Sequence, residues 1–210
     1  TGCLQMQFSN DGIVYSTPEL YAGTKTWALS SGSGAKTVYV RVRDKAGNWS
    51  SVQTTSITVD TTPPVTTASL AGGTYTTPQS VALACSDSDV SVCSAFYYTL
   101  DGSAPTTASS VYSGPINITS YVTLRFFARD LAGNNESPQS VTYIVDMQAP
   151  CTSPNPAGGT YYSWQSVALS CSDGIGSSGC DTIYYTTDGS TPTTSSSVYQ
   201  GLISIATTTT

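Results

Sequence analysis

The chain has 210 residues and a formal net charge of −6, with 7 basic residues, 13 acidic residues and no histidine. Only 10% of its residues are charged, against roughly 25% in an average soluble protein, and so few Lys and Arg exclude a nucleic-acid partner. Without histidine the chain lacks the commonest general base at neutral pH, and it has no run of ~20 apolar residues that would span a membrane.

Strands are the only regular elements that the sequence predicts. Taken in chain order, runs rich in β-branched and aromatic residues predict strands at residues 80–85, 95–99, 123–128 and 140–145. Asp-Gly pairs at residues 101–102 and 188–189 predict turns in which glycine supplies a positive φ. No segment has the i, i+3, i+4 spacing of an amphipathic helix. The chain is therefore expected to be all-β.

The sequence repeats itself with a period of 86 or 87 residues. The motif Ala-Gly-Gly-Thr-Tyr at residues 71–75 recurs at 157–161, and the motif Asp-x-Ala-Gly-Asn at residues 44–48 recurs at 130–134. About seven short strands fit into one period, which predicts tandem immunoglobulin-like or fibronectin-like β-sandwiches.

Aligning the copies divides the chain into three units. Unit one (residues 1–60) lacks its first strands, unit two (61–146) is complete, and unit three (147–210) lacks its last strands. We expect the chain to be a segment of a longer array. The alternative is that units of neighbouring chains complete each other by exchanging strands.

Motifs in units two and three resemble a known family. Residues 73–75, 81–83, 97–106, 111–114 and 128–134 carry the likeness. On these residues the two units resemble the chitobiase/β-hexosaminidase C-terminal domain, also called the fibronectin type III-associated domain. Unit one resembles the related bacterial immunoglobulin-like repeats of large surface proteins. The resemblance implies an extracellular module without catalytic activity.

Four cysteines pair through the repeat alignment. Cys85 ends one predicted strand and Cys93 begins the next, and Cys171 and Cys180 occupy the same places in unit three. Disulfides are typical of secreted proteins. We therefore expect one disulfide in each of these units.

The other two cysteines have no obvious partner. Cys3 aligns with Cys93, so its natural partner would lie in the absent part of unit one, and Cys151 aligns with Val65. Either the two remain free thiols, or they link neighbouring chains.

Carboxylates are expected to gather where consecutive units meet. Asp60 ends unit one and Asp146 ends unit two, and each would face the adjoining end of the next sandwich. The predicted calcium ligands are Asp60, Asp87, Asp89, Asp130 and Asn134 at the first junction and Asp146, Asp173 and Asp181 at the second. Ca²⁺ takes 6 to 8 such oxygen ligands. The alternative is that these side chains cap turns and bind no metal.

The three tryptophans allow two interpretations. Trp27, Trp49 and Trp164 could form a face that stacks on sugars, although tryptophan in a sandwich more often packs in the core.

The sequence favours a structural role. Only Glu19 and Glu136 are glutamates and most aspartates lie in turns, so we expect no enzyme active site. We expect a segment of a large extracellular or cell-surface protein, such as a stalk, adhesin or filament component, whose partners are further repeats or neighbouring copies. The alternative is an accessory carbohydrate-binding module of a secreted polysaccharide-degrading enzyme.

Overall fold

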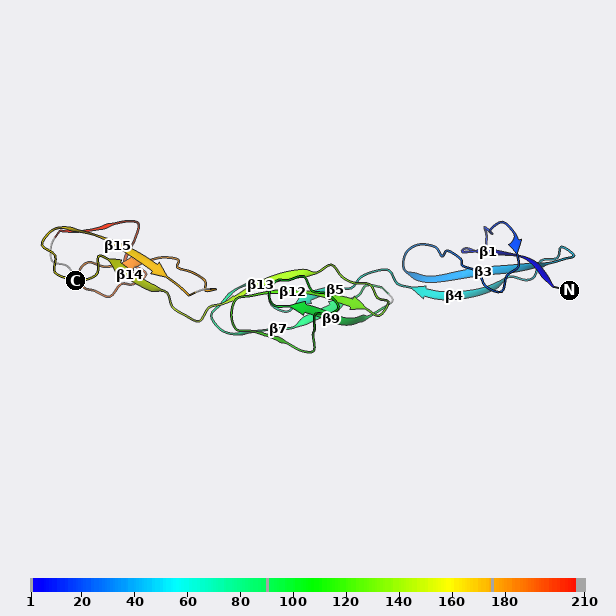
Figure 1. Cartoon of the computed structure of the whole chain (residues 1–210), viewed down its shortest axis with the longest axis horizontal. Helices are drawn as coiled ribbons and strands as arrows, with labels where there is room; N and C mark the ends of the chain where they lie inside the picture. Colours follow the sequence, from blue (N-terminus) through cyan, green and yellow to red (C-terminus); the bar gives the residue numbers. More distant parts are fainter. Residues whose placement is uncertain (1, 90, 175, 207–210) are drawn as a thin grey trace.

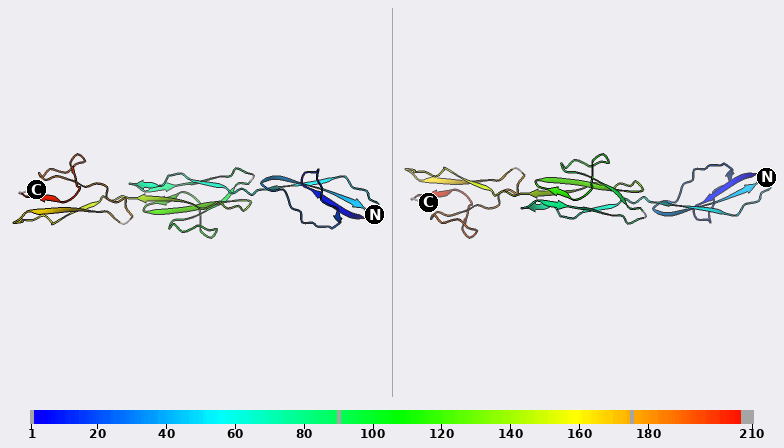
Figure 2. Two further views of the ribbon diagram at one scale, coloured as in Figure 1. Left: turned by 90° about the horizontal axis from the view of Figure 1, so that it is seen from above. Right: turned by 90° about the horizontal axis from the view of Figure 1, so that it is seen from below.

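The computed structural model describes residues 2–89, 91–174 and 176–206 and is all-β. The three units follow one another along the long axis of the molecule, with the two ends of the chain at opposite ends (Figure 1). Two further views show the same single row of units joined by short linkers (Figure 2). No helix in the part of the chain that the structure describes is long and apolar enough to cross a membrane.

Unit two is a sandwich of two layers. The first layer is a five-stranded sheet in the order β10 (Ser110–Val111), β9 (Cys93–Thr99), β12 (Val122–Asp130), β13 (Gln139–Val145) and β6 (Gly73–Tyr75). The second layer pairs β5 (Val65–Ala68) with β8 (Leu83–Ser86) and β11 (Ile116–Ile118) with β7 (Gln79–Val81). The strand predicted at residues 80–85 is thus interrupted at Ala82, whose backbone N–H donates to the hydroxyl of Ser69.

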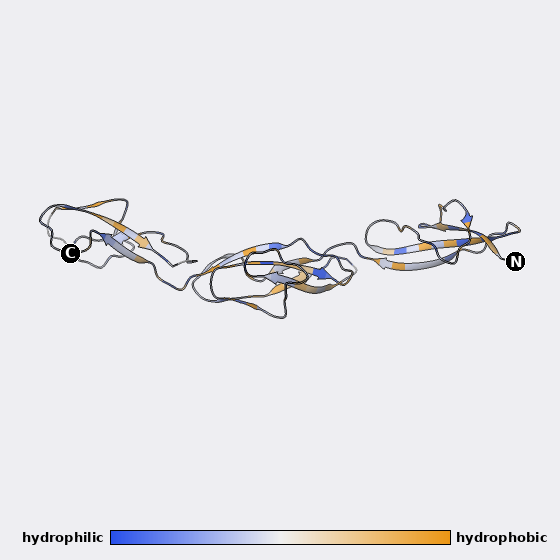
Figure 3. Cartoon of the chain, viewed as in Figure 1, coloured by the Kyte–Doolittle hydropathy of each residue, from blue (hydrophilic) through white to orange (hydrophobic). Residues whose placement is uncertain are grey.

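The core of unit two lies between these layers. Hydrophobic residues are spaced along the strands rather than gathered in one long run (Figure 3). The second layer contributes the buried side chains of Val81, Leu83, Ile116 and Ile118. The five-stranded sheet contributes those of Leu124, Phe126, Tyr143 and Val145. The alternation of inward and outward residues along each strand produces this core.

The first strand of unit two crosses from one layer to the other. It pairs antiparallel with β8 as β5 and then parallel with β13 as β6. Gly72 lies at the crossing, where a Cβ atom would come within 2.8 Å of the backbone oxygen of Thr142. The motif at residues 71–75 therefore needs glycine because the two backbones approach too closely for a side chain.

Unit one contains a single sheet in the order β2 (Glu19–Leu20), β1 (Cys3–Ser9), β3 (Gly34–Asp44) and β4 (Gln53–Val59). By the repeat it corresponds to β10, β9, β12 and β13 of unit two. Trp27 packs beside this sheet, with its ring 5.3 Å from that of Phe8. Arg41 lies against the ring of Trp49, 4.7 Å from its centroid.

Unit three contains the complementary set of strands. β14 (Cys151–Asn155), β15 (Gln165–Ser172) and β18 (Ile203–Ile205) form one sheet, and β16 (Tyr184–Tyr185) pairs with β17 (Ser197–Val198). Val167 and Leu169 match the buried Val81 and Leu83 by the repeat but are only partly buried. A hollow of about 810 Å³ adjoins them, because the described part of unit three has no strands equivalent to β12 and β13.

Candidate functional site at the junctions between units

The linker from unit one to unit two is held by hydrogen bonds to residues of unit two. The carboxylate of Asp60, just after β4, accepts the backbone N–H of Ser91 at 3.0 Å. The hydroxyl of Thr62 donates to the carboxylate of Asp89 at 2.9 Å. Asn134 Nδ2 donates to the backbone oxygen of Asp60 at 3.2 Å. These contacts fix the direction in which the chain enters unit two.

Unit one also contacts this linker. The backbone N–H of Thr61 donates to the hydroxyl of Ser33 at 2.9 Å, and the same hydroxyl lies 3.1 Å from that of Thr62. The linker is therefore bonded on both sides. Pro63 and Pro64 limit its backbone further, because proline fixes φ.

The repeated Asp-x-Ala-Gly-Asn motif forms a closed hairpin turn. One oxygen of Asp130 accepts the backbone N–H groups of Gly133 and Asn134, at 2.6 and 2.8 Å, and the other accepts Asn134 Nδ2 at 2.8 Å. Gly133 has a φ of 99°, which a side chain would disfavour. Asp44 binds the amide groups of Asn48 in the same way in unit one. The turn thus presents the Asn134 amide to the linker.

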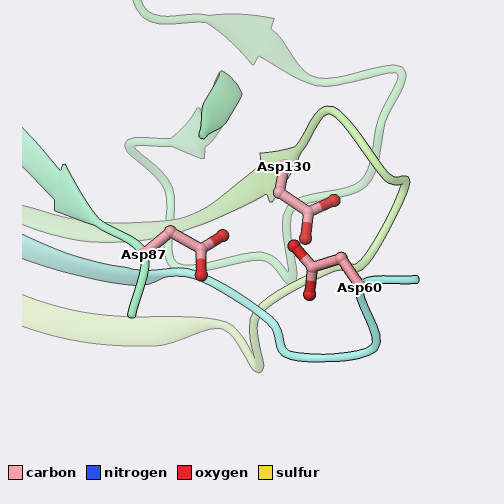
Figure 4. A group of neighbouring side chains, drawn as sticks. All are labelled: Asp60, Asp87 and Asp130. Atoms are coloured by element: carbon pink, nitrogen blue, oxygen red, sulfur yellow. The ribbon is translucent and has the colours of Figure 1, made fainter. Parts of the chain in front are cut away.

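Three carboxylates meet at the first junction. Oxygen atoms of Asp60, Asp87 and Asp130 all lie within 4.8 Å of one another, and the side chains point toward a common space from three different segments (Figure 4). Asp130 is only 2% exposed. In residues 2–89, 91–174 and 176–206 the only salt bridge joins Lys25 to Glu19, so no basic side chain there balances the charge of this cluster.

Two polar atoms, one in the cluster and one close to it in the chain, have no hydrogen-bond partner. Oδ2 of Asp87 and the hydroxyl oxygen of Ser91 are buried and make no hydrogen bond of good geometry. Burying a carboxylate oxygen without a partner is costly. The cluster can therefore accept a cation or a further hydrogen-bond donor.

Hydrogen bonds keep the junction carboxylates ionised. The side chain of Ser91, which is close although poorly aligned, and the amide of Thr62 lower the pKa of Asp60, while burial and the Asp130 carboxylate oppose them. Burial acts to raise the pKa of Asp130, but the hydrogen bonds from Asn134 and Gly133 outweigh it and the pKa is lowered. Both groups are anions at neutral pH.

The other two predicted ligands of the first junction act differently. Asp89 accepts the Thr62 hydroxyl, and Asn134 uses its amide N–H groups to bind the linker. Both lie at the junction as expected, but neither belongs to the group of three carboxylates. Their metal-binding role stays a prediction.

The second junction repeats the main contact of the first. Asp146 accepts both the backbone N–H and the hydroxyl of Ser178, at 2.8 and 2.6 Å, and these hydrogen bonds lower the pKa of Asp146. Oδ2 of Asp173 is buried without a partner, like that of Asp87. Among the residues that the structure describes, Asp181 accepts a side-chain hydrogen bond only from its neighbour Thr182. Within the described ranges no group of three carboxylates forms here.

Sequence reasoning missed the serines that receive the linker carboxylates. Ser91 and Ser178 lie 87 residues apart at equivalent places in the repeat. The equivalent spacing of the two serines was the only sign of their role in the sequence, and serine is too common in this chain for that spacing to stand out.

The structure supports both predicted disulfides. Cys85 is bonded to Cys93 and Cys171 to Cys180, across sequence separations of 8 and 9 residues. Cys3 and Cys151 are exposed free thiols. The first disulfide ties β8 to β9, and the second ties β15 to the segment that precedes β16.

Comparison with known proteins identifies the module. The sequence model of the chitobiase/beta-hexosaminidase C-terminal domain matches residues 70–141 and 156–210, which is more than half of the chain. The chain belongs to this family. The matched residues fall in units two and three, so the family predicted for them is confirmed. In the chitobiase/beta-hexosaminidase C-terminal family this domain is a non-catalytic, fibronectin-like module.

One solved structure is also similar to the chain. It is reported as "Structures of Clostridium thermocellum CbhA fibronectin(III)-like modules", with a TM-score of 0.35 and 16% sequence identity, over 69% of this chain and 79% of that chain. No curated protein matches the chain significantly.

Proposed function

We propose that the chain is a stiff spacer in an extracellular or cell-surface protein, working as part of a stalk, adhesin or filament. Its partners are further repeats of the same protein. The observation that carries this proposal is the clamp from Asp60 to Ser91, which recurs from Asp146 to Ser178. A linker that merely connected two domains would not need the same carboxylate contact at both junctions.

Two further features support this role. Disulfides persist in oxidising, extracellular surroundings, and each of the two bonds lies at the end of its unit that receives a linker. The low content of charged side chains offers few groups for binding or catalysis.

Small-angle X-ray scattering tests the spacer role. The double variant Asp60→Ala/Asp146→Ala loses both clamps and should show a broader distribution of maximum dimensions than the wild type. Asp101→Ala is the control, because Asp101 binds only its own turn through Ser103. Wild-type scattering that already requires freely jointed units would overturn the proposal.

We also propose that Ca²⁺ binds at the first junction. Asp60, Asp87 and Asp130 supply hard oxygen ligands from three segments, and the buried, unpartnered Oδ2 of Asp87 fits a cation. Bound there, the ion would offset two of the three negative charges of the cluster and tie the linker to two loops of unit two. At the second junction, the predicted ligands Asp146 and Asp173 are the counterparts of Asp60 and Asp87.

A further inference from the structure

Unit three carries two aromatic side chains in solvent on one short loop. Tyr162 and Trp164 are 101% and 80% exposed, in the segment between Tyr161 and β15. Residues this large usually bury most of their surface. The expectation that Trp164 packs in the core is therefore wrong, and its exposure calls for a physical reason.

The absence of the last strands from unit three does not cause this exposure. The positions equivalent to Tyr162 and Trp164 in unit two are Thr76 and Pro78. Both are exposed in unit two, although that sandwich is complete and is followed by another unit. A complete set of strands thus leaves these two positions in solvent, and unit three places aromatic rings there.

The loop that carries the rings is held in a fixed shape. At its start Tyr161 Oη donates to the backbone oxygen of Ala157 at 2.6 Å, and at its end Gln165 Nε2 donates to that of Ser163 at 3.1 Å. Unit two closes the same loop in the same way, from Tyr75 to Ala71 and from Gln79 to Thr77. A loop already fixed before binding loses little conformational entropy when a ligand binds.

The surroundings of the loop favour a neutral ligand. No charged residue occurs between residues 149 and 172, so neither an acidic nor a basic partner gains an ion pair here. Thr160, Ser163 and Gln165 offer hydroxyl and amide groups beside the rings. A pyranose sugar matches this chemistry, because its C–H faces pack on aromatic rings while its hydroxyls exchange hydrogen bonds with polar side chains.

We propose that Tyr162 and Trp164 form a binding site for a neutral polysaccharide on unit three. The site is separate from the junction clamps and does not depend on the spacer role. Both rings are among the residues that line the open hollow next to β15 and β18. The remainder of that hollow is not part of the site, because the equivalent residues of unit two, such as Val81 and Ile118, are buried under that unit's own strands. The array would then hold its successive units in line and also attach to a polysaccharide surface.

Co-sedimentation with insoluble cellulose and chitin tests the site. The double variant Tyr162→Thr/Trp164→Pro carries the residues that unit two has at these positions, so we expect it to fold and to melt like the wild type. Its binding to at least one of the two polymers should fall tenfold or more. Val111→Thr, which removes an exposed apolar side chain elsewhere, should bind like the wild type.

A graft provides the reciprocal test. Thr76→Tyr/Pro78→Trp in the background of the double variant places the ring pair on unit two and should restore binding. The proposal is overturned if the wild type sediments with neither polymer, if the double variant binds as well as the wild type, or if only acidic alginate is bound. Loss of self-association in the double variant, with no effect on polymers, would assign the rings to contacts between copies and would also overturn it.

Discussion

The carboxylate of Glu136 accepts the backbone N–H of Thr66 at 3.0 Å, across 70 residues of sequence. Its second oxygen accepts the backbone N–H of Ala128 at 3.2 Å, and its first oxygen also accepts a hydrogen bond from Gln139. One side chain thus joins the first strand of unit two to both strands of its last hairpin.

Replacing Glu136 should destabilise unit two. Glu136→Ala leaves two backbone N–H groups without an acceptor and removes one of the two acceptors of the Gln139 amide, which keeps the backbone oxygen of Thr66, at a cost of about 2 kcal/mol or more. Chemical denaturation followed by circular dichroism measures the change in the free energy of unfolding. The only other glutamate serves as control: Glu19 forms an exposed ion pair with Lys25, and Glu19→Ala should change the free energy of unfolding by at most about 1 kcal/mol. Equal effects of the two variants would contradict the role assigned to Glu136.

Acid should weaken the fold within a defined range of pH. The folded structure lowers the pKa of Asp60, Asp130 and Asp146 below the reference value of 3.8. Because the unfolded chain then binds protons more readily, the stability from these groups is complete above the unfolded pKa and is lost as pH falls through the lower folded values. The melting temperature should be level between about pH 5 and 7 and drop below about pH 4. A level profile down to pH 2.5 would rule this out.

Calcium should raise the melting temperature of the wild-type chain, and a chelator should remove the increase. At ten times the dissociation constant the stabilisation is about 1.4 kcal/mol. Asp87→Asn should abolish the response, since it removes the charge of the carboxylate whose Oδ2 has no other partner. Asp89→Asn should keep the response if the three carboxylates are the ligands. No shift in the wild type would remove calcium from the junction.

Loss of a disulfide should cost about 2.5 kcal/mol for a closed loop of this size. The double variant Cys85→Ser/Cys93→Ser removes the bond across 8 residues in unit two. Its unfolding midpoint in denaturant should fall clearly below that of the wild type. Cys3→Ser/Cys151→Ser removes two exposed free thiols and should leave the midpoint unchanged, whereas a matching loss would point to a bond between chains.

The sequence was most informative where it repeats. The fold class and the two disulfide pairs follow from the spacing of motifs, because a strand predicted in one unit is checked by its copy in the next. The break at Ala82 could not be predicted from the repeat. Every residue in the run at 80–85 is compatible with a strand, and the break arises where the first strand of unit two crosses from β5 to β6.

The junction was predicted only in part. The meeting of Asp60, Asp87 and Asp130 follows from the order of units and turns. The role of Ser91 was not predicted, because Ser91 donates through its backbone N–H, and a backbone contact is independent of residue type. The exposure of Trp164 was misjudged because composition says nothing about the side of a loop on which a ring lies. The comparison with Pro78 resolves it.

The parallel pairing of β6 with β13 determines how unit two responds to being stretched. The chain enters through the strand that becomes β6 and leaves through β13, and the three matched pairs run from Tyr143 and Gly73 to Val145 and Tyr75. Pulling on the two linkers slides these strands past each other, so their hydrogen bonds bear the load together rather than opening one after another. Unit two should therefore resist tension along the array better than its modest core alone suggests.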